Sequence, residues 1–105
     1  MDTSKEELYR EFLKDNPDDP LVHFSLGTLF LNESRLEEAI DELETTVKLK
    51  ADYMAAFWKL ANAYEENNNI DKAVRAYHQT LELAKQENDS TMIEDVQNRL
   101  EFLRS

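Results

Sequence analysis

The sequence predicts an all-α protein in which pairs of helices stack into a short solenoid. Three observations lead to this prediction: a segment that repeats at an offset of 34 residues, apolar side chains at helical spacing, and a composition with one glycine and two prolines. Repeats of roughly 20 to 50 residues mark units that cannot bury an apolar face alone and must stack on a neighbour. A composition poor in glycine and proline favours helix. We therefore expect no strands.

The repeat is visible when the chain is shifted by 34 residues, because ten positions then agree in size and polarity. The matched pairs are Leu26 with Leu60, Gly27 with Ala61, Phe30 with Tyr64, Leu36 with Ile70, Ala39 with Ala73, Ile40 with Val74, Leu43 with Tyr77, Thr46 with Thr80, Val47 with Leu81 and Leu49 with Leu83.

Length and composition limit the domain organisation and the class of partner. The chain has 105 residues, enough for one domain with a modest core, and it has no cysteine for a disulfide framework or a thiolate metal site. Twelve basic against 23 acidic residues give a net charge of −11, which disfavours nucleic acid and anionic membrane surfaces. No apolar run approaches a membrane span and the first residues are polar. We expect a soluble, cytoplasmic protein.

The first helix is expected from about Ser4 to Asp15, with Ser4 and Glu7 at capping-box spacing. The run from Asn16 to Pro20 should end it. Pro20 can then open a second helix, with Asp19 as its cap, that ends near Asn32.

The same pattern continues to the end of the chain. Ser34 is expected to begin a third helix that runs from Leu36 to about Lys50. Further helices are expected over Tyr53 to Glu66 and Ile70 to Gln86, separated by three asparagines that favour a turn. A last helix should open at Asp89 or Ser90.

Each 34-residue unit resembles a tetratricopeptide repeat, a helix-turn-helix unit with large and small apolar residues at fixed slots. In the first unit the family's slots hold His23, Leu26, Gly27, Phe30, Ala39, Leu43 and Ala51. In the second unit they hold Phe57, Leu60, Ala61, Tyr64, Ala73, Tyr77 and Lys85. Neither unit has the family's terminal proline, and His23 replaces an aromatic residue, which places a polar ring near the stacked face.

The resemblance implies one domain of two repeats, 20–53 and 54–87, with an N-terminal helix in 1–17 and a C-terminal capping helix in 88–105. We expect about five helices in all. Leu8 to Pro17 resembles the second helix of a preceding unit. Ile93, Val96 and Leu100 resemble the start of a third unit if two extra residues precede them. Because terminal units must present one side to water, both end helices are interpreted as caps.

The resemblance also implies a protein-protein interaction module, an adaptor or scaffold whose concave face binds a peptide or helix of a partner. Carried over by position, that face consists of Leu21, Phe24, Thr28 and Leu31 from the first repeat and Ala55, Trp58, Asn62 and Glu65 from the second. Phe24 and Trp58 occupy equivalent slots and resemble an interaction hot spot. The alternative function is a structural protein that self-associates as a homodimer through its exposed helical faces. For the aromatic rings themselves, the alternative to partner binding is that the last helix, or a second copy of the chain, covers them.

One branch of the family binds acidic tails of chaperones through a clamp of Lys, Asn and Arg. Here the corresponding slots hold Phe24, Thr28 and Lys59, and those of a third unit hold Asp89 and Ile93. One lysine cannot hold a pair of carboxylates on a chain of this charge. We expect no binding of such tails.

No residue pattern predicts catalysis, a cofactor or a metal. His78 and Glu82 share a helix face but lack further ligands. Asn67, Asn69 and Asp71 alternate like the ligands of a calcium loop, yet the glycine that the sharp turn needs is missing. We therefore expect a protein that is not an enzyme and has no catalytic, cofactor-binding or metal-binding residues.

Overall fold

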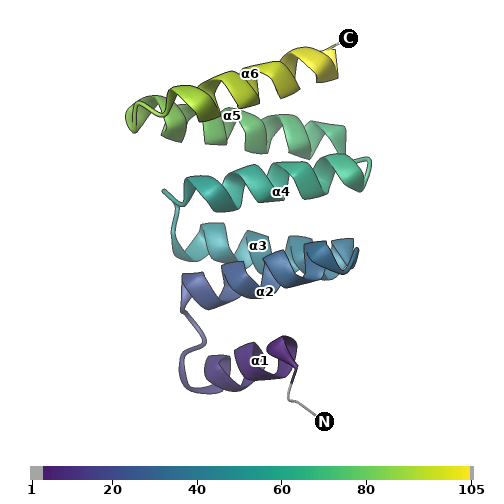
Figure 1. The fold of residues 1–105 in the computed structure, drawn as a ribbon, viewed down its shortest axis with the longest axis vertical. Helices are drawn as coiled ribbons and strands as arrows, with labels where there is room; N and C mark the ends of the chain where they lie inside the picture. Colours follow the sequence, from purple (N-terminus) through teal and green to yellow (C-terminus); the bar gives the residue numbers. More distant parts are fainter. Residues whose placement is uncertain (1–3, 105) are drawn as a thin grey trace. The chain divides into compact units, whose positions relative to one another are not determined.

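The computed structural model describes residues 4–104, which form six α-helices and no strand (Figure 1). The helices are α1 (Lys5–Asp15), α2 (Pro20–Asn32), α3 (Leu36–Leu49), α4 (Met54–Glu66), α5 (Ile70–Gln86) and α6 (Ser90–Arg104). They belong to two compact units, Met1–Ala51 with α1 to α3 and Asp52–Ser105 with α4 to α6. The expected all-α fold is confirmed.

The expected number of about five helices is wrong, since the described residues contain six. Both end segments form complete helices with caps of their own. Ser4 Oγ accepts from the Glu7 amide at 3.2 Å and donates to the Glu7 carboxylate at 3.3 Å, which is the expected capping box of α1. Asp89 Oδ1 accepts from the Met92 amide at 3.0 Å at the start of α6.

Three inter-helix turns share one hydrogen-bond pattern, and this pattern corrects the expected role of Ser34. Ser34, Asn68 and Asn88 have φ near +60°, at 61°, 60° and 56°. After α2, the Ser34 amide donates to the Leu31 carbonyl and the Arg35 amide donates to the Phe30 carbonyl. This is a Schellman motif, in which a left-handed residue ends a helix. Ser34 therefore terminates α2, and Arg35 takes the N-cap position of α3 without a side-chain cap bond.

In the first unit, α2 and α3 cross closely where the sequence places small residues. Leu26, Gly27 and Ala39 are buried there. A Cβ added at Gly27 would lie 2.9 Å from Leu43 Cγ, so a larger residue needs Leu43 to move. Tyr9 and Leu13 of α1 pack against this core.

A charged cluster and a histidine join the helices of the first unit. Arg35 lies over the Phe30 ring at 4.3 Å and donates to Glu6 of α1 at 2.8 Å and to Glu38 of α3 at 2.6 Å. His23 of α2 lies 2.7 Å from the Glu42 carboxylate through Nδ1 and 2.7 Å from the Pro17 carbonyl oxygen through Nε2. The polar ring expected at this slot thus links α2 to α3 and to the turn before it.

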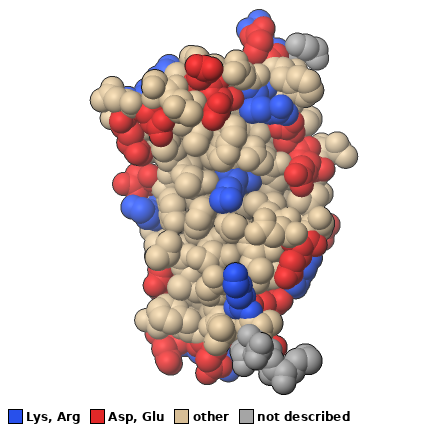
Figure 2. All heavy atoms as spheres, viewed as in Figure 1, with Lys and Arg blue, Asp and Glu red and all other residues tan. Residues whose placement is uncertain are grey.

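In the second unit, α4 packs against α5, and α6 covers the other side of α5. The core consists of apolar residues from the three helices together with one threonine, Thr80, whose hydroxyl donates to the Ala76 carbonyl at 2.8 Å. Ala61 is completely buried in α4, as its small-residue slot requires. Across the face of the chain shown in Figure 2, carboxylates gather toward the helix ends, and a few Lys or Arg side chains lie among uncharged residues in the middle.

Candidate functional site

The residues predicted to bind a partner lie on α2 in the first unit and on α4 in the second. They occupy equivalent slots 34 residues apart: Leu21 and Ala55, Phe24 and Trp58, Thr28 and Asn62, Leu31 and Glu65. Leu21 and Ala55 are exposed, and the other six are half-buried. None of the eight is sealed in a core, so each helix presents its set as a partly accessible surface.

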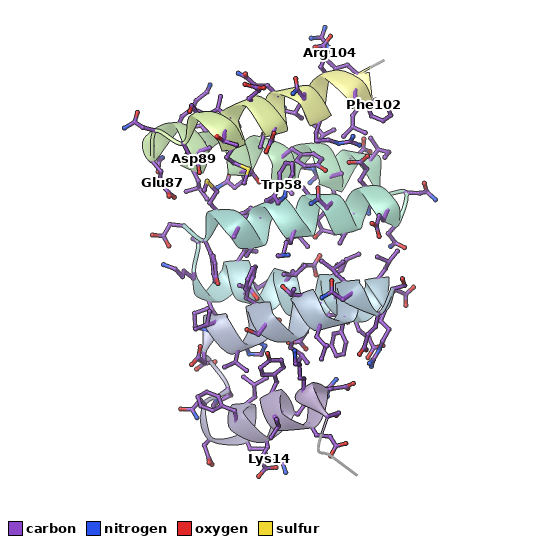
Figure 3. All side chains as sticks on the ribbon, in the orientation of Figure 1. Lys14, Trp58, Glu87, Asp89, Phe102 and Arg104 are labelled. Carbon is purple, nitrogen blue, oxygen red and sulfur yellow. The ribbon has the colours of Figure 1, made fainter. Side chains whose placement is uncertain are left out.

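In the second unit, Trp58 extends from α4 (Figure 3). It packs against a buried tyrosine of α5. The rings of Trp58 and Tyr77 meet edge to face, with centroids 5.6 Å apart and an interplanar angle of 62°. Such pairs contribute about 0.5 to 1.5 kcal/mol beyond area burial. Because Tyr77 is fully buried, it fixes the indole while leaving part of it accessible.

The Tyr77 hydroxyl joins two of the predicted site residues. Its oxygen lies 2.7 Å from the Asn62 side-chain amide and 2.8 Å from the Glu65 carboxylate. A phenol has one proton, which it donates to the ionised carboxylate as the stronger acceptor. The Asn62 contact is made through its side-chain carbonyl oxygen, which leaves the N–H groups of that amide outside the network. Burial, supported by the Glu65 bond, raises the pKa of Tyr77 above its usual 10.0.

Arg99 of α6 completes the network by donating to the second oxygen of Glu65. Its guanidinium carbon lies 4.7 Å from the centroid of the Phe102 ring. Asn62, Glu65, Glu66 and Arg99 line a polar cavity of about 360 Å³. Helix α6 thus reaches Glu65, while Trp58 stays half-buried.

On α2 the corresponding surface is more apolar. Leu21 is 61% exposed, and Leu31 packs at the edge of the first unit's core. The Thr28 hydroxyl oxygen is buried and lacks a hydrogen-bond partner in the described part of the chain. A buried hydroxyl without a partner carries a desolvation cost of about 1 to 3 kcal/mol, which a hydrogen bond to a ligand can offset.

The candidate ligand patterns take ordinary structural roles. Asn69 accepts from the Lys72 amide at 3.3 Å and so caps α5, which makes the asparagine run a turn. No group of three or more potential metal ligands occurs within residues 4–104. Over the same residues, no helix combines the length and apolar character that crossing a bilayer requires.

Two models of the tetratricopeptide repeat match the chain, over residues 6–53 and 55–86. The chain belongs to the tetratricopeptide repeat family. The two matches together include α1 to α5, and the first extends over α1, which precedes the two predicted repeats. Tetratricopeptide repeats are typically non-enzymatic scaffolds, and this fold supports a protein-interaction module.

Relatives with tetratricopeptide repeats include plant, animal and structurally characterised proteins. The chain is 31% identical over 67 residues to the tetratricopeptide repeat domain-containing protein PYG7, chloroplastic, of Arabidopsis thaliana. The aligned segment covers 64% of this chain and 22% of that protein. The chain is also 28% identical over 98 residues to DnaJ homolog subfamily C member 7 of Mus musculus. That aligned segment covers 90% of this chain and 20% of the mouse protein. The chain thus spans about a fifth of the length of these relatives.

A solved structure with a similar fold is the first tetratricopeptide repeat domain of Spaghetti (RPAP3), which is bound to the HSP90 peptide SRMEEVD. It superposes with a TM-score of 0.81 at 17% identity, covering 94% of this chain and 74% of that one. At this identity the likeness establishes the fold.

Two residues of the hydrogen-bond network around Glu65 were missed by sequence reasoning, Tyr77 and Arg99. Tyr77 was assigned to the core, and its hydroxyl gave no local sign of its partners. Arg99 lies on α6, and in the register that matches Ile93, Val96 and Leu100 to the earlier repeats its slot gives no sign that it pairs with Glu65. The repeat boundaries 20–53 and 54–87 remain predictions.

Proposed function

We propose that the chain binds a segment of a partner protein on the faces of α2 and α4 that carry the eight predicted residues. The proposal rests on the arrangement of Trp58, Asn62 and Glu65 on α4, which we call the Trp58 surface. An indole that is half-buried and fixed by Tyr77 is a rigid, partly apolar anchor. Anchors of this type dominate the energetics of protein interfaces.

The hydrogen-bond network supports this role because it fixes the polar groups before a partner arrives. Asn62 contacts the Tyr77 hydroxyl through its side-chain carbonyl oxygen and keeps its two N–H groups for the carbonyl groups of a partner backbone. The charge of Glu65 is paired with that of Arg99, and its other oxygen accepts a hydrogen bond from the Tyr77 hydroxyl. Preorganisation of this kind reduces the entropy lost on binding.

The distribution of charge indicates the chemistry of the segment. On the face shown in Figure 2, carboxylates gather toward the helix ends, and the middle is uncharged apart from a few Lys or Arg side chains. We infer that the partner segment has an apolar centre, which contacts Trp58 on α4 or Phe24 on α2, with basic residues beside it. A net charge of −11 favours such a segment over an acidic one.

Selection from a peptide library tests the proposal. Random 15-residue peptides displayed on phage are selected on the wild-type chain, and their affinities are measured by calorimetry. Loss of a hot-spot side chain costs about 2 kcal/mol, so Trp58→Ala should weaken the selected peptides roughly 30-fold. Ile70→Ala serves as the control because it truncates an exposed apolar residue at the start of α5, away from the Trp58 surface.

Two results would contradict the proposal. One is a set of selected peptides that bind wild type and both the Trp58→Ala and Phe24→Ala variants with equal affinity. The other is that the control substitution Ile70→Ala weakens the binding of the selected peptides while Trp58→Ala leaves it unchanged.

A further inference from the structure

Helix α4 carries a second row of side chains that does not belong to the Trp58 surface. Phe57, Leu60 and Tyr64 follow one another at helical spacing and lie on a different face of α4, because successive residues turn by a fraction of 3.6 per turn. Together with α5 this row borders a cavity of about 280 Å³, which we call the Arg75 pocket. The pocket is lined by Phe57, Leu60 and Tyr64 of α4 and by Lys72, Arg75, Ala76 and Gln79 of α5.

The Arg75 pocket has an apolar floor. Leu60 and Tyr64 are buried and Phe57 is half-buried, so two aromatic rings and one aliphatic side chain form its base. Aromatic rings of this kind favour a flat apolar group that can pack against a face or an edge.

The rim of the pocket is basic. Lys72, Arg75 and Gln79 are exposed, and their spacing of three and four residues places them on one side of α5. None of the described residues that line the pocket is acidic. Lys72 Nζ lies 5.6 Å from the centroid of the Tyr64 ring, and neither Lys72 nor Arg75 forms an ion pair within residues 4–104. Two unpaired cations thus stand beside the pocket on a chain whose net charge is −11.

Comparison with the first unit shows why this place is open in the second. At the repeat offset of 34 residues, Phe57 and Ala76 correspond to His23 and Glu42. In the first unit the side chains of His23 and Glu42 meet at 2.7 Å. In the second unit the alanine has no side chain to reach across, and the phenylalanine has no polar group to bind. The second unit therefore lacks the polar pair that occupies these slots in the first.

The charge of the rim is also reversed between the units. Lys72 and Arg75 correspond to Glu38 and Asp41 of α3. Acidic residues near the start of a helix are stabilised by its partial positive charge, and basic residues there are not. The two basic residues near the start of α5 are therefore unfavourable for that helix by itself. An anion held between them would offset this cost.

We propose that the Arg75 pocket binds a small, free carboxylic acid with a flat aromatic body. The Arg75 guanidinium would donate two N–H groups to the carboxylate, with Lys72 as the second positive charge. The aromatic body would pack on Phe57 and Tyr64. Pockets for drug-sized ligands have volumes of roughly 300 to 1,000 Å³, so a pocket of about 280 Å³ limits the ligand to one or two rings.

Naphthalene-2-carboxylate is the probe for a first test. It is titrated into the isotope-labelled full chain and followed by nuclear magnetic resonance. The Arg75 Nε–H and the Gln79 side-chain amide should shift, with a dissociation constant of about 1 mM for a ligand of about 13 non-hydrogen atoms. Naphthalene-2-carboxamide lacks the charge and acetate lacks the rings, so each should bind at least about tenfold more weakly.

Substitutions of single cations give the decisive test. Arg75→Gln should weaken naphthalene-2-carboxylate about tenfold, because it removes the paired N–H groups. Lys72→Gln should weaken it about threefold, because an exposed ammonium contributes less. Lys85→Gln is the matched control: it removes the same charge from an exposed position on α5 outside the pocket and should leave the affinity unchanged.

Four results would overturn the proposal: no shifts up to about 10 mM acid, equal affinity for the acid and the amide, equal loss in Arg75→Gln and Lys85→Gln, or shifts confined to Trp58 and Asn62. Because the substituted residues are exposed, circular dichroism should show the helix content of wild type for every variant. None of them is among the eight predicted binding residues, so this proposal and the proposed partner binding can fail separately.

Discussion

Replacing Tyr77 by phenylalanine tests the network that fixes the Trp58 surface. The substitution keeps the ring that packs against Trp58 and removes the hydroxyl that joins Asn62 and Glu65. Hydrogen bonds to charged groups contribute about 1.5 to 3 kcal/mol, and the Glu65 side chain is 21% exposed, which reduces this contribution. We expect Tyr77→Phe to lower the free energy of unfolding by about 1 to 2 kcal/mol. For a domain of this size, that corresponds to a fall in melting temperature of roughly 5 to 10 °C.

Thermal unfolding followed by the fluorescence of Trp58 measures this loss within the second unit. The chain has one tryptophan, so the signal reports on the helix that carries it. Tyr9→Phe is the matched control, because it removes a phenol oxygen from α1 in the first unit and should leave the Trp58 transition unchanged.

A double-mutant cycle with Glu65→Gln shows whether the loss comes from the bond itself. The coupling free energy between the two substitutions should be about 1 kcal/mol, because both remove the same charge-assisted interaction. Additive effects, or a Tyr77→Phe protein that melts with the wild type, would refute the inferred network.

Four further outcomes are expected. Burial alone lowers the pKa of His23, but its hydrogen bonds to Glu42 and Pro17 raise that pKa above 6.5. The stability that the protonated ring contributes is therefore complete below pH 6.5 and is lost as the pH rises through the folded-state pKa. Urea titrations at several pH values should show this loss in wild type and not in His23→Gln. Ala61→Leu should overpack a buried slot and cost about 1 to 3 kcal/mol in the same titrations, and an unchanged midpoint would contradict the register. Ser34→Gly should raise the melting temperature, because a left-handed serine costs about 1 to 2 kcal/mol, and a lower melting temperature would count against the turn geometry. A heptapeptide that ends in acidic residues and a free carboxylate should show no binding in calorimetry, and micromolar affinity would disprove the expectation based on the clamp slots.

The repeat and most helix ends could be predicted because they depend on local or periodic information. Asp19, Ser4 and Asn69 bond to amides two or three residues away, so their sequence spacing is enough to place them. Gly27 and Ala61 recur at one repeat offset, and their burial follows from that recurrence. Ser34 was assigned to the start of α3 because serine is a common N-cap, whereas in the structure it is the left-handed residue of the Schellman motif that ends α2.

The candidate site was only partly predictable, because its polar geometry depends on contacts between helices. Glu65 was expected on an accessible face, but the sequence did not show that Tyr77 and Arg99 would bind it from two other helices. His23 was expected as a polar ring near a stacked face, and its partners lie on α3 and in the preceding turn. Such pairings follow from the packing of the helices and not from spacing along one of them.

Nuclear magnetic resonance titration of the chain with a selected apolar peptide is the most direct test of partner binding. The account predicts that the indole N–H of Trp58 and the side-chain amide of Asn62 shift during the titration, while His78 and Gln97 in the groove between α5 and α6 do not. Shifts at the groove, with Trp58 and Asn62 unchanged, would contradict it.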